Sequence, residues 1–387
     1  MTEIRFVTRE IGSLAKPGWR VKAIAGRPVE QRDVEEAGRW GERLGVERAE
    51  ELTEILRKGE GFTDRERQKI QDYAALYGIR LLERAGLDVV YDGEQRRSEM
   101  YDHVVRHARG FETRGTVRSF DNKYYTKAAV VEKPLVERPY DLEEFEFVRS
   151  QASPDRTIKV PFTGAYTIVD WSYDEHYARN GSMLGAAAKE RTQARQRFGV
   201  DVARDVVRPN VLGLVEAGAE WVQIDEPAAT TRPEEVPLVV ETFNATREGV
   251  RARASMHICF SDYNCLFPHI EALDDCYELQ LEFSNRDSRE LGTKADDRPG
   301  YDVLGKFARS EWRGKVGLGV IDIHTNFIEP PELVRDRILY AARILGPERL
   351  EVNTDCGLRT RTWEVSLEKL RNMVEGARLA EATLNGS

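Results

Sequence analysis

The chain has 387 residues, of which 41% are hydrophobic and 32% are charged, and its formal net charge is -9. This composition predicts a soluble globular protein with a sizeable core and excludes a disordered chain. The negative balance argues against nonspecific nucleic-acid binding, and no run approaches the roughly 18 apolar residues of a membrane span. The N-terminus shows no signal peptide and the four cysteines are too few for a disulfide scaffold, so we expect a cytoplasmic protein with free thiols.

Short apolar runs that end in polar residues recur eight times along the chain. Clear helical patterns, such as those over residues 190–217 and 331–345, separate several of them. Strand–helix alternation predicts parallel strands, and eight repeats favour a closed (β/α)₈ TIM barrel over an open sheet. The predicted strands cover residues 6–13, 88–94, 158–163, 221–226, 253–259, 279–284, 315–322 and 350–354.

Two segments are longer than a minimal barrel requires. Residues 29–85 are charged and helical in pattern, which predicts a long helical insertion after the first strand. Residues 111–142 are rich in Tyr, Thr and Val, which predicts a hairpin-like excursion before the third strand. We therefore expect one domain over residues 1–387 that contains both insertions. The alternative is a separate helical domain over residues 1–145.

His257 and Cys259 are the most informative pair in the chain. Both lie in a predicted buried strand, where side chains two residues apart point to the same face. An imidazole beside a thiol is half of a zinc site, although a buried histidine next to an inert cysteine would give the same pattern. Glu282 and Cys356, at later strand ends, would complete a set of one imidazole, two sulfurs and a weaker oxygen ligand. Such a set suits a catalytic zinc, because the oxygen can yield to a substrate.

Polar residues gather where the predicted strands end. In a barrel enzyme the active site lies at the carboxyl ends of the strands. Buried carboxylates are costly unless they are paired or bind a metal, so this many converging groups indicates a catalytic site. Two thiolates favour zinc over magnesium or calcium. The residues at these ends are Ser13, Glu94, Asp225, Glu226, His257, Cys259, Glu282, Asp322 and His324, with Cys356 just beyond the last strand.

The chain resembles the catalytic, C-terminal barrel of cobalamin-independent methionine synthase. The resemblance runs in order from about residue 8 to residue 363. It implies a zinc-dependent methyltransferase that passes a methyl group to the thiol of homocysteine and forms methionine. The motifs that carry it are Ile11-Gly12-Ser13, Asp92-Gly93-Glu94, Trp171-Ser172, Gln223-Ile224-Asp225-Glu226-Pro227, His257-Ile258-Cys259, Glu282 with Ser284 and Arg286-Asp287, Asp322-Ile323-His324 and Asp355-Cys356-Gly357-Leu358.

The resemblance also implies a role for each site residue. Zn²⁺ would be held by His257, Cys259, Glu282 and Cys356. The substrate-binding residues would be Ile11, Ser13, Glu94, Asp225 and Trp171: the two acids bind the amino group of homocysteine, Ser13 and a neighbouring backbone amide receive its carboxylate, and Trp171 lines the methyl-donor pocket. His324 would be the catalytic proton donor or relay.

The expected methyl donor follows from the length of the chain. Full-length members of the family carry a second, N-terminal barrel that helps to bind polyglutamylated folate, and this chain has no such half. Shorter relatives of the catalytic barrel are associated with corrinoid donors. We therefore expect methylcobalamin or a corrinoid protein as the donor, rather than methyltetrahydrofolate.

Two other functions compete with this interpretation. The first is zinc-dependent alkyl transfer to another thiol such as coenzyme M, for example from an epoxide. Asp225 and Glu94 argue against it, because coenzyme M has no amino group for two carboxylates to hold. The second is a zinc-stabilised barrel that binds a partner without chemistry. His324 and the weaker oxygen ligand Glu282 argue against that, because structural zinc sites are closed.

Overall fold

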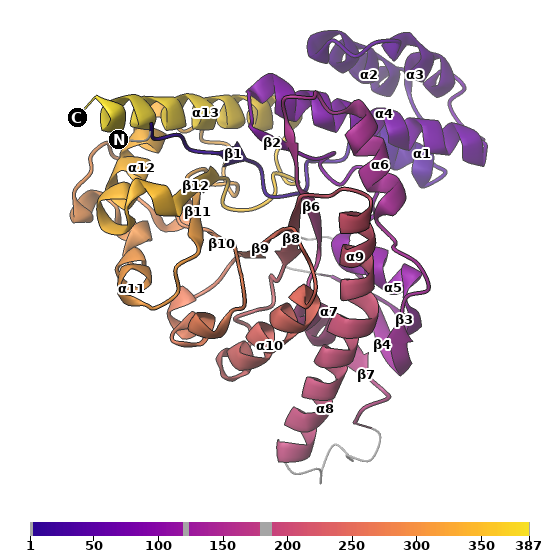
Figure 1. Ribbon diagram of the computed structural model, residues 1–387. Helices are drawn as coiled ribbons and strands as arrows, with labels where there is room; N and C mark the ends of the chain where they lie inside the picture. The colour runs from indigo at the N-terminus through magenta and orange to yellow at the C-terminus, as the bar shows by residue number, and fades with distance from the viewer. Residues whose placement is uncertain (1–2, 119–123, 179–187, 387) are drawn as a thin grey trace.

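A barrel of parallel strands lies at the centre of the computed structural model, which describes residues 3–118, 124–178 and 188–386 (Figure 1). The strand order is β5-β2-β1-β12-β11-β10-β9-β8-β6, and every neighbouring pair in it is parallel. The expected TIM barrel is therefore confirmed. The strands are β1 (Thr8–Arg9), β2 (Val89–Val90), β5 (Thr157–Ile158), β6 (Val160–Thr163), β8 (Trp221–Asp225), β9 (Arg253–Ile258), β10 (Glu278–Leu281), β11 (Lys315–Gly319) and β12 (Leu350–Asn353).

The third predicted strand is divided in two at Lys159. Its first half, β5, pairs with β2, and its second half, β6, pairs with β8. The two ends of the sheet therefore meet within one stretch of chain, which brings the barrel close to closure. Each of the eight predicted strands contains or overlaps a strand of the structure.

Helices surround the barrel strands (Figure 1). A π-helical turn at Ala203–Val207 joins α8 to α9 just before Pro209, which has no N–H to donate to a regular helical ladder. The helices are α1 (Gly18–Ile24), α2 (Gln31–Leu44), α3 (Ala49–Leu56), α4 (Asp64–Ala85), α5 (Met100–His107), α6 (Leu142–Gln151), α7 (Ala165–Trp171), α8 (Ala188–Val202), α9 (Arg208–Glu216), α10 (Val236–Arg247), α11 (Leu304–Arg309), α12 (Pro331–Leu345) and α13 (Trp363–Asn385).

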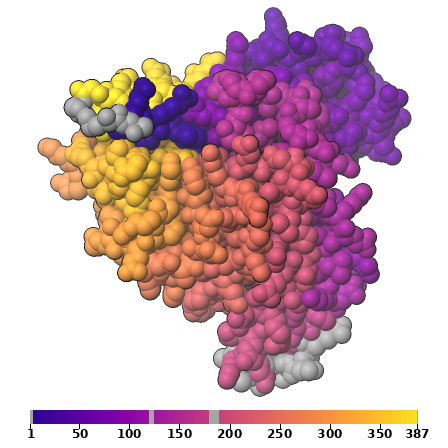
Figure 2. Space-filling model, viewed as in Figure 1, coloured from indigo at the N-terminus to yellow at the C-terminus, as the bar shows by residue number. Residues whose placement is uncertain are grey.

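The predicted helical insertion over residues 29–85 is present as α2 to α4, and α1 precedes it. Helices α2 and α3 project from one end of the molecule (Figures 1 and 2). α4 begins at a capping box, in which the Thr63 hydroxyl and the Glu66 carboxylate each accept a backbone N–H from the other residue. Trp40 of α2 packs on Trp363 of α13 with ring centroids 5.3 Å apart, so the insertion shares the barrel's hydrophobic core. This contact supports the single-domain division, which stays a prediction.

The predicted excursion before the third strand is an antiparallel hairpin of β3 (Arg109–Arg118) and β4 (Tyr124–Leu135). A short strand, β7 (Tyr173–Asp174), extends it in parallel to β4. The hairpin is shorter than the predicted range, because its second strand ends seven residues before α6 begins at Leu142. Its connection, residues 119–123, lies outside the described part of the chain.

Side-chain alternation gives the barrel a polar interior. Gln223 and Asp225 of β8 point to one face, and Val222 and Ile224 to the other, where they join the hydrophobic core. Near the amino ends of the strands, Arg9 forms buried ion pairs with Glu278 and Glu351. No helix within the described ranges combines the length and the apolarity that a membrane span requires.

Candidate functional site

A cavity of about 440 Å³ opens at the carboxyl ends of the barrel strands. It brings together seven of the ten site residues predicted from the sequence: Ile11, Ser13, Glu94, Asp225, His257, Cys259 and Cys356. Its remaining wall consists of Gly12, Leu14, Ala15, Lys16, Val21, Ser98, Glu99, Met100, Tyr124, Tyr125, Pro227, Gly357 and Arg359. The three predicted residues outside this lining are Glu282, His324 and Trp171.

One imidazole and two thiols meet in the cavity wall. The ligand atoms of His257, Cys259 and Cys356 all lie within 4.8 Å of one another. The Nδ1 atom of His257 is 3.1 Å from the Gln280 carbonyl oxygen, and its buried Nε2 has no hydrogen-bond partner among the described residues. Burial lowers the pKa of His257 to about 3, so the ring is neutral. Donation from Nδ1 to a carbonyl leaves a lone pair on Nε2, which is the arrangement of a zinc-binding histidine.

The two cysteines favour the same interpretation. A hydrogen bond with Cys259 and burial both raise the pKa of Cys356 well above its ordinary value. A divalent cation has the opposite effect, because it stabilises the thiolate. Cys259 is only 6% exposed, whereas Cys356 is partly exposed in the cavity wall. One imidazole and two thiols therefore fit a zinc ion.

Glu282 lies beside this group but outside the 4.8 Å cluster. Its Oε2 atom accepts hydrogen bonds from the Phe260 amide at 2.9 Å and the Asn285 side chain at 3.0 Å. Its Oε1 atom is buried without a hydrogen-bond partner in the described chain and lies 3.8 Å from Nε2 of His324. The His324 side chain is 33% exposed, and its ring packs on Phe260 with centroids 4.6 Å apart. The imidazole of His324 thus lies next to the one oxygen of Glu282 that has no hydrogen-bond partner in the described chain.

Two carboxyl groups, Asp225 and Glu94, also line the cavity, and Asp225 is the register partner of His257 on the neighbouring strand. We call these two residues the acid side of the cavity, and His257, Cys259 and Cys356 its cysteine side. Oδ1 of Asp225 accepts a hydrogen bond from Nε2 of Gln223 at 2.7 Å. Burial and the neighbouring Glu94 raise the pKa of Asp225 well above its usual range. A Cβ atom at Gly12 would lie 2.8 Å from Oε1 of Glu94, so glycine at this position allows the close approach of that carboxylate. A positively charged ligand group between the two acids would relieve their repulsion.

Ser13 connects the acid side of the cavity to the cysteine side. A Cβ atom at Gly357 would lie 2.9–3.0 Å from the backbone N, the backbone O and the hydroxyl of Ser13. The absent side chain at Gly357 therefore lets Ser13 contact the loop that carries Cys356. The buried Ile11 precedes this turn, and its carbonyl accepts hydrogen bonds from Lys159 and Gln223.

Trp171 lies away from these groups. It ends α7 and packs on Tyr101 with ring centroids 6.1 Å apart, and its carbonyl accepts a hydrogen bond from Lys127 at 2.6 Å. The aromatic residues that line the cavity are instead Tyr124 and Tyr125, at the start of β4. The role of Trp171 at the methyl donor stays a prediction.

Three residues near the acids were not among the predicted site residues: Lys16, Lys159 and Gln223, of which only Gln223 belongs to a motif of the resemblance. Lys159 interrupts an apolar strand run, and a lysine in a buried strand is a signal that could have been read from the sequence. Gln223 shares a strand face with Asp225, because the two are separated by one residue. Lys16 lies in a loop without a periodic pattern, so no local sequence signal points to it.

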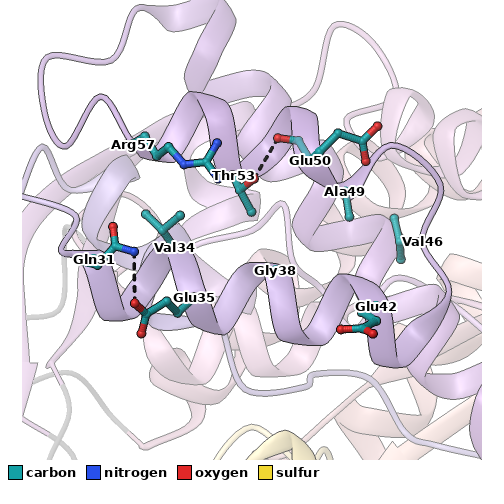
Figure 3. A pocket seen from close by; sticks show the side chains of 10 residues that line it. All are labelled: Gln31, Val34, Glu35, Gly38, Glu42, Val46, Ala49, Glu50, Thr53 and Arg57. Atoms are coloured by element: carbon teal, nitrogen blue, oxygen red, sulfur yellow. Dashed lines mark hydrogen bonds between the residues drawn. The ribbon is translucent and has the colours of Figure 1, made fainter.

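A second hollow, of about 460 Å³, lies between α2 and α3 (Figure 3). Two hydrogen bonds join polar groups in its wall: Gln31 donates to Glu35 at 3.0 Å, and the Thr53 hydroxyl donates to the Glu50 carbonyl at 2.9 Å. The His, Cys, Asp and Glu groups that could bind a metal within the described chain lie elsewhere. The chemistry therefore belongs to the cavity at the strand ends.

Comparison with known proteins places this site in a family. The sequence model for the catalytic domain of cobalamin-independent synthase matches residues 45–379. A methionine synthase from Thermoplasma acidophilum is 35% identical over 377 residues, which are 95% of this chain and 96% of that protein. A methionine synthase from Thermoplasma volcanium is 38% identical over 325 residues, which are 79% of this chain and 88% of that protein.

The fold has a solved counterpart as well. A B12-independent methionine synthase from Shewanella sp. W3-18-1, solved in complex with selenomethionine, superposes with a TM-score of 0.73. It is 21% identical and covers 99% of this chain and 100% of its own. These comparisons confirm the expected enzyme class, a methyltransferase of the methionine synthase type. The chain belongs to the cobalamin-independent synthase family, whose catalytic-domain model matches most of its length.

Proposed function

We propose that this protein forms methionine by transferring a methyl group to the sulfur of homocysteine. The observation that carries the proposal is that one cavity contains both halves of an acceptor site. Its cysteine side offers His257, Cys259 and Cys356, and its acid side offers Asp225 and Glu94. Homocysteine has a thiol at one end and an ammonium group at the other, so its two ends match the two sides.

The residues that would hold zinc are His257, Cys259 and Cys356, with Glu282 as the weaker oxygen ligand. The orphaned Nε2 of His257 and the orphaned Oε1 of Glu282 support this assignment. Bound there, zinc would lower the pKa of the substrate thiol, so that a thiolate is available at neutral pH. The carboxylate of Glu282 is the ligand that the substrate thiol would replace, because zinc at this site prefers sulfur to oxygen.

The protein's own groups would orient the acceptor. Asp225 and Glu94 would bind the ammonium group, and Ser13 with its neighbouring backbone amide would receive the carboxylate. In the reaction the thiol loses its proton, the sulfur gains the methyl group, and the donor leaves with the bonding electron pair. Coenzyme M has no ammonium group, so it would leave both acids without a partner.

The methyl donor expected from the sequence is a methyl-corrinoid. When a methyl group is transferred from cobalt, the leaving corrinoid does not have to be protonated, so that reaction has little need of a general acid. The position of His324, with Nε2 3.8 Å from Glu282 and a partly exposed ring, favours the alternative donor, methyltetrahydrofolate. The folate amine must be protonated as it leaves, and a partly exposed histidine beside Glu282 could supply that proton.

The test is methionine formation by zinc-loaded protein from homocysteine, with methylcobalamin and with methyltetrahydrofolate as separate donors. The proposal expects methionine from at least one donor and no product when coenzyme M replaces homocysteine. Methylated coenzyme M as the faster product, or no methionine from either donor, would overturn it.

A further inference from the structure

Lys159 is a buried cation in the wall of the barrel. It lies between β5 and β6, where the third strand is interrupted, and is 2% exposed. Its Nζ atom donates to the carbonyl of Glu10 at 2.9 Å, to the carbonyl of Ile11 at 2.8 Å and to Oε1 of Gln223. An ammonium group has three protons, so all of its donors are used. Lys159 does not line the cavity, and it therefore acts on the ligand through its partners.

The contact with Lys159 fixes the amide of Gln223. Because Oε1 accepts from Lys159, the NH₂ group must face the other way. There Nε2 donates to the Ile11 carbonyl at 2.7 Å and to Oδ1 of Asp225 at 2.7 Å. Lys159 thus orients Asp225 through one intermediate side chain.

The same lysine holds the segment that leads to Ser13. Its bonds to the consecutive carbonyls of Glu10 and Ile11 tie the end of the first strand to the third strand. Gln223 bonds to the Ile11 carbonyl as well, so a lysine and an amide converge on one oxygen. Both walls of the proposed amino-acid subsite, Asp225 and the turn that carries Ser13, therefore share Lys159 as an anchor.

We propose that Lys159 is a positioning residue that sets the selectivity of this site for a thiol with an α-amino acid group. The inference rests on the proposed function, because it assigns the amino-acid end of homocysteine to the Asp225 and Ser13 walls. The cysteine side of the cavity has no hydrogen bond to Lys159. Loss of Lys159 should thus affect recognition of the amino acid and leave thiol binding intact.

The test compares two thiols in the zinc-loaded protein. Calorimetry gives the Kd for homocysteine and for 1-propanethiol, which lacks the ammonium and carboxylate groups. In Lys159→Met, homocysteine should bind about 10-fold to 100-fold more weakly, since small misplacements of binding groups have effects of this size. The Kd for propanethiol and the zinc content should stay at the wild-type values.

A second variant keeps the proposal falsifiable if Lys159→Met does not fold. Gln223→Glu is nearly isosteric and retains a partner for Lys159, but it has no proton to donate to Asp225. It should show the same selective loss for homocysteine. Lys369→Met is the matched control: Lys369 is equally buried and bonded to two carbonyls and Glu329, away from the acids. Its homocysteine Kd should be unchanged.

The outcomes separate this inference from the proposed function. A wild-type protein that does not bind homocysteine contradicts the proposed function itself. If the wild type binds homocysteine normally but Gln223→Glu leaves the homocysteine Kd unchanged, only the role of Lys159 is overturned. The same holds if the variants bind homocysteine and propanethiol more weakly to an equal extent. Equal loss of homocysteine affinity in the Lys369→Met control would also overturn it.

Discussion

Nδ1 of His257 lies 3.1 Å from the carbonyl oxygen of Gln280, on the neighbouring strand. The two residues are register partners of β9 and β10, so the sheet itself sets the orientation of the imidazole. Because Nδ1 carries the proton, Nε2 has a lone pair that is free to bind a metal next to the two cysteines. A histidine that is oriented before the metal arrives loses less entropy when it binds, which favours a tightly held ion.

The first prediction concerns the metal. Purified protein should contain about one zinc per chain, and Cys356→Ser should lose most of it, because the hydroxyl is a poor zinc ligand. Elemental analysis of the purified variants gives the result. Cys276→Ser is the control, since Cys276 is buried elsewhere with its Sγ atom 3.4 Å from the Glu278 carbonyl. Wild-type zinc in Cys356→Ser would remove that residue from the ligand set.

The second prediction concerns the ammonium group. Asp225→Asn should weaken homocysteine binding by about 3–5 kcal/mol, the usual cost of removing one partner of a buried charge pair. Zinc content should stay intact, because Asp225 is outside the His257, Cys259 and Cys356 cluster. Calorimetric titration with homocysteine checks the affinity. An unchanged Kd would favour a thiol without an amino group as the substrate.

The third prediction is a proton released from Asp225. Burial and Glu94 raise its pKa in the free protein, and an ammonium group would lower it again. Binding should therefore release a proton, and homocysteine affinity should increase as pH rises toward the pKa of the free carboxyl. Calorimetric titrations with homocysteine in buffers of different ionisation enthalpy give the number of protons released on binding. Asp225→Asn should release fewer protons than the wild type; equal release would place the titrating group elsewhere.

The fourth prediction separates the methyl donors through His324. If a methyl-corrinoid is the donor, His324→Asn should retain most of its activity with methylcobalamin, since cobalt leaves without a proton. A general acid typically contributes about 10²–10⁴-fold, so activity with methyltetrahydrofolate should decrease by that range. Steady-state rates with both donors, in both proteins, supply the comparison. A faster wild-type reaction with methyltetrahydrofolate, abolished in the variant, would show that the corrinoid assignment is wrong.

The fifth prediction concerns stability in acid. Burial alone would raise the pKa of Asp141, but Arg97 and the hydrogen bond with His103 outweigh it and hold the pKa at about 2. The unfolded chain binds this proton near pH 4, so the contribution to folding is complete above that pH and is lost as pH falls toward 2. Denaturant unfolding at pH 3 and pH 6 should therefore show a smaller difference in Asp141→Asn than in the wild type.

The control for this prediction is Asp155→Asn. Asp155 is exposed and lies 3.6 Å from the guanidinium of Arg156, so its substitution should leave the pH dependence at the wild-type value. An Asp141→Asn protein with the wild-type difference between the two pH values would contradict the assignment of the acid slope to this buried ion pair.

The sequence predicted the barrel because each strand is a short apolar run that ends in a chemically distinctive residue. His257 and Cys259 could be paired from strand alternation alone. The family resemblance then supplied Glu94 and Asp225 as one pair of acids, and the structure places both in the cavity wall.

The rest depends on contacts between distant segments. The third strand changes its pairing partner at Lys159. The side chain of this residue bonds to the carbonyls of Glu10 and Ile11, 149 and 148 residues away, and no local pattern encodes these contacts. The position of Trp171 outside the cavity depends on how α7 packs on Tyr101. The hairpin was predicted from its composition, but the contribution of Tyr124 and Tyr125 to the cavity depends on where it folds over the barrel.

The most direct test of the central claim is X-ray absorption at the zinc edge, with and without homocysteine. The site offers two protein sulfurs, Cys259 and Cys356, so the free protein should show two sulfur neighbours. Homocysteine should raise the number to three, with loss of an oxygen neighbour as Glu282 yields. An unchanged spectrum in the presence of saturating homocysteine would contradict the account, because the substrate thiol would then react away from the metal.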